Sequence, residues 1–224
     1  MADAVGQSLS FAVGVALSPV PIVGVVLMLG TPRARSNGLA FLLGWLAGIA
    51  VVGAIVLVAA GGAGAAENGE PADWVSVLKL ILGGLLIAVA VRQWRGRPRP
   101  GEEPALPAWM RTIDRFTAPK AGGFGILLSG VNPKNLLLIV GGAAAIAQTG
   151  ASTGQQAAAL AVFAVVATLG TGTPVALYLA LGDRSASLLG ELKDWMSRNN
   201  AAIMAVIALI IAAKLIGDAI SALA

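Results

Sequence analysis

The sequence contains no cysteine and no histidine. It therefore has no thiolate nucleophile, no imidazole base and no Cys/His site for zinc or haem. Acidic residues are also scarce, at eleven, and charged residues of both signs make up only 12% of the chain. We expect no cofactor, no metal site and no enzymatic activity.

Apolar residues, in contrast, are abundant. They make up 57% of the 224 residues, and the mean hydropathy is +0.85. A soluble domain is about 45–50% apolar and about 25% charged. The composition therefore predicts an all-α integral membrane protein. Its net charge of +4 is then explained by basic loops that face anionic lipid headgroups, and no nucleic-acid partner is needed.

Six transmembrane helices are expected, because a span needs about 20 mostly apolar residues. Asp3 and Arg33 are separated by 29 uncharged residues, and Arg35 and Glu67 by 31, so each interval holds one helix. The other four are predicted over residues 74–94, 121–148, 155–182 and 200–222. No basic residue precedes the first apolar run, so we expect a retained helix and no cleaved signal peptide.

The distribution of Lys and Arg predicts the orientation. The first, third and fifth loops together carry 12 basic residues, and the second and fourth carry none. Basic loops stay in the cytoplasm. We therefore expect a multi-pass protein of the bacterial plasma membrane with both termini outside. In the third loop, Trp109, Ile113 and Phe116 recur at helical spacing beside Arg111 and Arg115, as in a short helix on the inner leaflet or in a solvated linker.

The two halves of the chain show a weak internal match. Val15–Ile22 (VALSPVPI) resembles Ile126–Pro133 (ILLSGVNP) at a shift of 111 residues, which places Ser18 on Ser129. Three helices in each half would make the second half an inverted copy of the first. We expect a three-helix repeat over 1–94, a basic cytoplasmic connector over 95–120 and a second three-helix repeat over 121–224.

Prolines mark the centre of the first and fourth predicted helices. Pro19 lies about 22 Å along its helix and Asn132, next to Pro133, about 17 Å along the other, so both positions fall near the midplane. Proline removes a backbone donor and frees carbonyls, which in lipid need another partner. Matched breaks in two halves are typical of a transporter's binding site. An ordinary proline kink is the alternative.

Three lysines lie outside the loops. Lys134 is the deepest, and insertion of its charge into a membrane costs about 2.5–3.5 kcal/mol. We interpret it as an anion partner or a charge that a coupling proton neutralises; a structural ion pair or a snorkelling lysine is the alternative. Lys214 and Asp218 are expected to pair structurally at i,i+4. Lys79 is expected to reach outward to Glu67, Glu70 and Asp73.

Two glycine-containing segments complete the pattern. The segment 170–174, Gly-Thr-Gly-Thr-Pro, predicts either close helix packing or a third broken segment. Gly44 and Gly48 predict a helix contact. The candidate substrate-binding residues are those at or near the breaks: Ser18, Pro19, Pro21, Ser129, Asn132, Pro133, Lys134, Asn135, Thr171 and Thr173.

The opening SLSFAVGVALSPVPIVGVVLMLGTPRARSNGLAFLLGWLAG, the segment VNPKN and the basic connector resemble the Gap/Sap family of peptidoglycolipid- and sulfolipid-addressing proteins, in the lysine-exporter (LysE) superfamily. The resemblance covers nearly the whole chain. It implies a six-helix inverted-repeat transporter that exports a glycolipid or lipid precursor. The shared pattern maps onto Pro19, Pro21 and Asn132–Lys134. Val20 stands where the superfamily's amino-acid exporters have a glycine, which argues against an amino-acid substrate.

The resulting hypothesis is export of a lipid or other anionic amphiphile by alternating access. The chain has no ATP-binding motif, so a gradient or a partner must supply the energy. Expected partners are membrane lipids and a lipid or glycolipid substrate; a homodimer and a place in a larger lipid-export complex stay open. The alternatives are a small-solute exporter of amino acids or cations and, less favoured, an intramembrane lipid-modifying enzyme.

The predicted topology can be tested by labelling single cysteines with an impermeant thiol reagent, because the chain has none of its own. Cysteines at Gly69 and Gly150 should label from outside intact cells, and those at Ser36 and Gly101 should label only after the membrane is opened. Outside labelling at Gly101 would contradict both the orientation and the inverted repeat.

Overall fold

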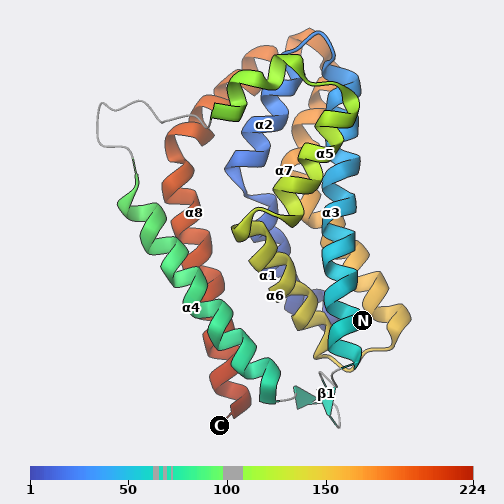
Figure 1. Cartoon of the computed structure of the whole chain (residues 1–224), viewed down its shortest axis with the longest axis vertical. Helices are drawn as coiled ribbons and strands as arrows, with labels where there is room; N and C mark the ends of the chain where they lie inside the picture. Colours follow the sequence, from blue (N-terminus) through green and yellow to red (C-terminus); the bar gives the residue numbers. More distant parts are fainter. Residues whose placement is uncertain (63–65, 68–69, 72, 98–107, 224) are drawn as a thin grey trace.

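The computed structural model describes residues 1–62, 66–67, 70–71, 73–97 and 108–223, and within this part the chain is almost entirely helical (Figure 1). The α-helices are α1 (Ala2–Ala16), α2 (Pro19–Leu29), α3 (Ala34–Gly62), α4 (Asp73–Arg95), α5 (Ala118–Gly130), α6 (Pro133–Ala147), α7 (Thr153–Leu181) and α8 (Ala186–Leu223). Two 3-10 helices, η1 (Ala108–Arg115) and η2 (Gly182–Ser185), join them. The two-residue strands β1 (Ala66–Glu67) and β2 (Glu70–Pro71) pair antiparallel.

Several helices are long and apolar enough to cross a membrane. Three segments qualify alone, Ala34–Gly61, Trp74–Arg95 and Thr153–Ala222, and the number rises to five if each of two bent helix pairs is one span. The third segment contains both α7 and α8 with η2 between them. The chain is therefore a multi-pass membrane protein, as the composition predicts.

The first and fourth predicted helices are both broken. The helix pair α1 and α2 bends by 51°, and α5 and α6 bend by 64°. Pro19 and Pro133 each occupy the first turn of the second helix in their pair, where the missing N–H is not needed. The break is thus an end and a new start, whereas a proline kink would lie within one helix.

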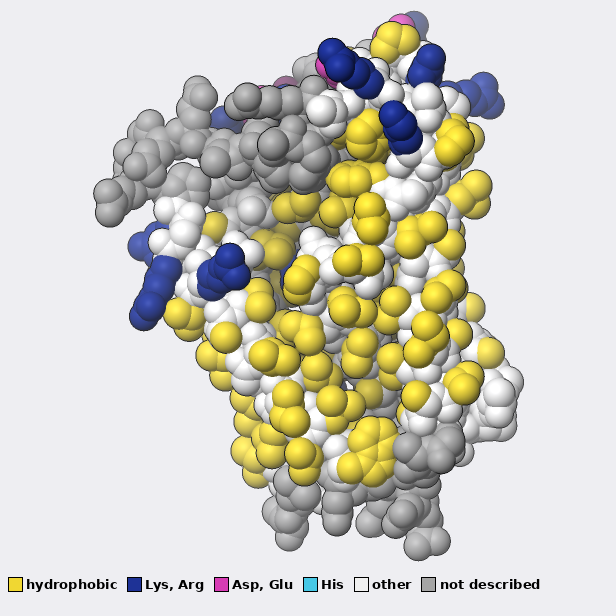
Figure 2. Space-filling view, in the orientation of Figure 1, with side chains coloured by type: hydrophobic (Ala, Val, Ile, Leu, Met, Phe, Trp, Pro, Cys, Tyr) yellow, Lys and Arg dark blue, Asp and Glu magenta, His cyan; other side chains and the backbone are white. Residues whose placement is uncertain are grey.

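The bundle has two ends that differ in the segments they contain. The α2–α3 turn, η1 and η2 lie at one end, which we call the basic end; the α6–α7 turn and the C-terminus lie toward the other, the terminal end (Figure 1). Lys and Arg side chains gather at the basic end and where α4 finishes, and hydrophobic side chains cover the middle and lower part of the same face (Figure 2). The predicted segregation of charge is therefore present in three dimensions.

Two sequence predictions need correction at the basic end. The last helix begins at Ala186 and not near residue 200, so most of the predicted fifth loop is helical. In the connector, η1 is a short helix, but Ile113 is buried and Phe116 packs edge-on against Phe124 with ring centroids 5.5 Å apart. This face of η1 therefore covers the protein interior and does not lie on the membrane. The connector's residues 98–107 lie outside the described part.

Glycines allow the long helices to approach the broken ones. A Cβ on Gly44 would overlap the carbonyl oxygen of Gly122 on α5, and one on Gly48 would overlap the Ser129 hydroxyl. The predicted contact at these two glycines is confirmed. Gly170 of α7 likewise leaves no room for a Cβ beside the Ala16 carbonyl, where α1 ends.

The segment 170–174 is packed and unbroken. Helix α7 continues through Pro174 from Thr153 to Leu181. Thr173 donates its hydroxyl to the Leu169 carbonyl at 2.7 Å, which supports the helix near the proline. Close packing is the correct alternative, and the third broken segment is wrong.

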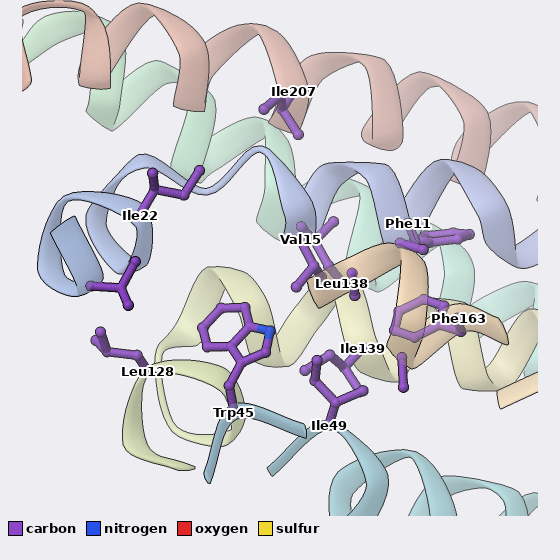
Figure 3. Packing of buried hydrophobic residues seen from close by; sticks show 14 of the residues in the cluster. Phe11, Val15, Ile22, Trp45, Ile49, Leu128, Leu138, Ile139, Phe163 and Ile207 are labelled. Carbon is purple, nitrogen blue, oxygen red and sulfur yellow. The ribbon is translucent and has the colours of Figure 1, made fainter. Parts of the chain in front are cut away.

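These contacts enclose one main apolar core at the level of the breaks. Figure 3 shows Trp45 of α3 between Leu128 of α5 and Ile139 of α6, with Val15 of α1 and Leu138 nearby. Trp45, Leu138 and Ile139 are fully buried. The breaks lie beside this core: Ser18 and Asn135 are buried, whereas Leu17 and Val131, between the paired helices, are exposed.

Because α3 and α5 lie so close, adding a methyl group at two different glycines of α5 should change the melting temperature differently. At Gly125 a Cβ would lie 2.8 Å from the Trp45 amide nitrogen, whereas Gly123 has nothing within 4 Å. Gly125→Ala should lower the melting temperature in detergent, because overpacking costs about 1–3 kcal/mol. Gly123→Ala is the control and should be neutral or stabilising, because alanine favours helix. Equal shifts in the two variants would contradict the packing.

Candidate functional site

The two helix breaks are built in the same way. Ser18 and Asn132 are the N-caps of α2 and α6, both with extended backbone, ψ 109° and 119°, and each is followed by a proline. A residue before proline avoids the α-helical region, so the sequence ends the preceding helix there. The two N-caps are 114 positions apart. Both residues thus occupy the same place in a broken helix pair, and their spacing of 114 differs by three from the predicted shift of 111, which pairs Ser18 with Ser129.

Each break frees a backbone carbonyl inside the protein. In a continuous helix the Ser18 amide would pair with the Gly14 carbonyl, but it donates to Val15 instead, at 3.1 Å. In the second pair the Asn132 amide donates to Leu127 and leaves the Leu128 carbonyl free. Such carbonyls need another donor when water is absent.

Two adjacent side chains of α6 supply these donors. Lys134 Nζ donates to the Gly14 carbonyl at 3.3 Å, and Asn135 Nδ2 donates to the Leu128 carbonyl at 2.8 Å. Gly14 and Leu128 occupy equivalent places, four residues before Ser18 and Asn132. The first turn of α6 therefore closes the broken end of α5 and, across the molecule, the broken end of α1.

Lys134 is the charged group of this site. Its side chain is 3% exposed, and no Asp or Glu among the described residues forms an ion pair with it. The alternatives of a structural ion pair and of a lysine snorkelling to the surface are both wrong. A buried ammonium held by one carbonyl is a costly arrangement.

The surroundings of Lys134 favour an anion. The side chain of Asn132 caps α6 by accepting the Lys134 amide at 3.1 Å, and its own Nδ2 amide group has no hydrogen-bond partner among the described residues. Asn132 is half-buried. Two helix N-termini, of α2 and α6, start at the breaks, and the positive ends of helix dipoles attract negative charge. Nζ, Nδ2 and these N-termini provide donors and positive potential together.

The structure adds two groups that sequence reasoning missed, the Trp45 indole and the Gly14 carbonyl. The indole nitrogen of Trp45 is buried with no hydrogen-bond partner in the described part of the chain, as is Oδ1 of the predicted site residue Asn135. Trp45 lies against Leu128, beside the break of α5 (Figure 3). Tryptophan in membrane helices is usually found at the interfaces. Trp45 instead lies mid-way along an apolar run, and this position in the sequence could have indicated a polar group buried near the breaks. The Gly14 carbonyl had no signal, because a backbone acceptor leaves no mark in a sequence.

Not all the predicted site residues meet here. Thr173 is exposed and Thr171 bonds within its own helix to the Thr168 carbonyl. Ser129 is buried but donates to the Gly125 carbonyl at 2.9 Å, so its hydroxyl serves α5. Pro21 is buried in the first turn of α2. Among the predicted residues, Lys134 and Asn135 of α6 bond to the carbonyls freed at the two breaks, and Ser18, Pro19, Asn132 and Pro133 form the starts of α2 and α6.

Two apolar grooves reach the site from opposite sides. The first, of about 340 Å³, lies between α1 and α8 and runs from Gly6 to Gly14 and Leu17. The second, of about 400 Å³, lies between α4 and α6 and is lined by Leu85, Ala88, Val89, Arg92, Pro133, Leu136 and Leu137. The first touches Gly14 and the second touches Pro133, so the Lys134–Gly14 hydrogen bond stands between them.

A second group of charges lies between α4 and α8. Lys214 and Asp218 form the predicted i,i+4 ion pair at 2.6 Å. Lys79 is buried and is attracted electrostatically by Asp218. It therefore faces α8; the side chains of Glu67, Glu70 and Asp73, its predicted partners, lie outside the described part. The cluster joins α4 to α8.

Among the described residues no group of three or more Asp or Glu side chains is placed to hold a metal ion. The charged side chain at the breaks is the ammonium of Lys134, which attracts anions.

Comparison with known proteins gives one match. A model of the Sap (sulfolipid-1-addressing protein) family matches residues 9–221. No curated protein and no solved structure matches the chain. The matched residues include both helix breaks and both grooves, apart from the groove residue Gly6.

The different caps of the two breaks predict different effects of alanine. The Asn132 side chain caps α6, whereas the Ser18 side chain makes no capping hydrogen bond to α2. Asn132→Ala should lower the free energy of unfolding by about 1 kcal/mol, the usual value of an N-cap. Ser18→Ala, the equivalent change in the other half, should have little effect. Melting temperatures in the same detergent would show this difference, and a larger loss for Ser18→Ala would contradict it.

Proposed function

The chain belongs to the sulfolipid-1-addressing protein family, and from this premise we propose that it is a transporter that exports an anionic lipid by alternating access. The family ties it to lipid-related export at a membrane. The finer statement rests on one observation: a buried lysine bonded between the two broken helix pairs, with an apolar groove on either side.

Six spans in two inverted halves are the architecture we propose. Counting α7 and α8 separately, with each bent pair as one span, gives six. Most contacts between helices support the repeat, because they have a counterpart when the halves are exchanged; the extensive contact of α1 with α6 is an exception, since α5 and α2 have none of similar extent. Helix α1 contacts α7 as α5 contacts α3, and α2 contacts α7 and α8 as α6 contacts α3 and α4. The exchange replaces α3 by α7 and α4 by α8, so the α3–α7 contact and the α4–α8 contact are each unchanged by it.

The glycine contacts follow the same exchange. Gly48 of α3 fits against Ser129 near the end of α5, and Gly170 of α7 fits against Ala16 at the end of α1. Each long helix thus supports the break of the opposite half. Two such units can rock about the central site, the motion by which inverted-repeat transporters alternate access. We therefore place the resemblance to the LysE superfamily within this proposal.

The substrate's anionic group would compete with the Gly14 carbonyl for Lys134. In the described conformation Nζ has only that carbonyl, and a sulfate or phosphate oxygen is a stronger acceptor because it is charged. Its binding would release α1 from α6 and allow the halves to move. Asn132 Nδ2 would supply a second donor. Acyl chains would stay in the apolar grooves, so no closed polar cavity is required.

The direction of transport follows from the charges. We propose that the basic end faces the cytoplasm of a bacterial cell and the terminal end faces outward. Arg92, in the last turn of α4, marks the end of the α4–α6 groove nearer the basic end, and the α1–α8 groove runs from the break toward the terminal end. A lipid would enter with its headgroup at Arg92 and leave by the α1–α8 groove. The energy would come from a gradient or from a partner protein in a larger export complex.

The proposal is tested by complementing a gene deletion and comparing surface lipids. The parent chain and Lys193→Met, which removes a half-buried lysine paired with Asp194 at the basic end, should restore the surface lipid profile. Lys134→Met should not, at equal protein levels in the membrane, because the anion partner is lost. Lys134→Arg keeps the charge and should restore part of the activity.

Two outcomes would contradict this. Full complementation by Lys134→Met would show that the lysine is structural. An unchanged lipid profile in the deletion strain, together with sensitivity to a basic amino acid or a metal, would replace lipid export by small-solute export.

A further inference from the structure

The groove between α4 and α6 has the form of a lipid site. Leu85, Ala88, Val89 and Arg92 follow one another at i, i+3, i+4 and i+7, so they form one stripe along α4. Pro133, Leu136 and Leu137 form the matching stripe on α6. Both stripes are apolar except at Arg92, and Leu85 is 47% exposed. The groove therefore opens to the bilayer.

Arg92 gives the groove one charged end. It lies in the last turn of α4, on the side of the basic end, and it is exposed. Its side chain makes no hydrogen bond or ion pair within the described residues. Arg97, by contrast, stacks over the Trp94 ring at 4.1 Å and donates to the Trp94 carbonyl. Of these two arginines, only Arg92 both lines the groove and is free to bind a headgroup.

We propose that this groove binds a membrane lipid with an anionic headgroup, held by Arg92, and delivers it to Lys134. The occupant is a lipid, because six of the seven lining residues are apolar and the seventh, Arg92, places a cation at one end of the groove. The inference rests on the lipid export proposed above and adds the place where the lipid is loaded. Arg92 acts there as a specificity-determining residue.

The path to the transport site is short along the chain. Pro133 lines the groove, and the next residue, Lys134, turns inward to the Gly14 carbonyl. A lipid in the groove has its chains along Leu136 and Leu137 and its headgroup at Arg92, in the last turn of α4. Transfer of the anionic group from one cation to the next needs no exposure of acyl chains to water.

The test uses single cysteines in full-length protein reconstituted into nanodiscs. A bimane label on Ala88→Cys reports the groove, and one on Ile87→Cys, the neighbouring exposed position outside it, is the control. Quenching by brominated phosphatidylglycerol is compared with quenching by brominated phosphatidylcholine at equal amounts. At Ala88 the anionic lipid should be preferred by about fivefold, the factor for about 1 kcal/mol per basic residue at a membrane surface. Ile87 should show no preference.

Charge variants assign the preference to one residue. Arg92→Gln should reduce it to about one, whereas Arg95→Gln, which removes a charge from the same turn outside the groove, should keep most of it. Equal quenching by the two lipids at Ala88, or the same loss in both variants, would overturn the proposal.

The binding measurement needs no transport, so the two proposals fail separately. A preference at Ala88 with normal lipid export by Lys134→Met would keep the groove and refute the transport site. Lipid export that depends on Lys134, without a preference at Ala88, would keep the proposed function and refute the loading groove.

Discussion

Backbone carbonyls freed within a membrane protein need new donors, and the centre of this molecule is organised by two of them. The prolines after Ser18 and Asn132 end α1 and α5 and leave the Gly14 and Leu128 carbonyls without helical partners. Water could satisfy such groups in a soluble protein, but the hydrocarbon core of a bilayer has none. Two neighbouring side chains of α6 therefore have to reach both carbonyls.

This requirement explains much of the surrounding packing. Lys134 can reach α1 only if α1 and α6 lie very close, and at Gly14 a Cβ would be 3.2 Å from a methyl group of Leu138. Glycines on α3 and α7 then allow the long helices to close around the broken ones. The abundance of small residues is thus a condition for satisfying the breaks. It also leaves grooves at the lipid-facing edges, because small side chains do not fill them.

The hydrogen bond between Lys134 and the Gly14 carbonyl is one that a negatively charged ligand could replace. An ammonium bound to a neutral carbonyl inside a protein is less well satisfied than one bound to an anion. In the export proposed above, a charged headgroup would replace this contact, while Phe11 and Gly14 of α1 stay packed against Gly141 and Leu138 of α6. Asn135 instead closes α5 within its own half. One of the two equivalent breaks is tied locally and the other across the halves, which gives the otherwise similar halves different roles.

The sequence by itself determined the class of protein, the presence of several helices long enough to cross a membrane, the segregation of basic loops and the positions of both breaks, because hydropathy, charge and proline act through local or bulk properties. It also indicated Lys134 as the deepest cation. The tertiary structure decided which groups meet it. The Gly14 carbonyl, the unpartnered Trp45 nitrogen and the early start of α8 depend on how helices pack, as does the outward direction of Thr173. A hydrogen bond between residues 120 positions apart has no local pattern, since only the folded chain brings its donor to its acceptor.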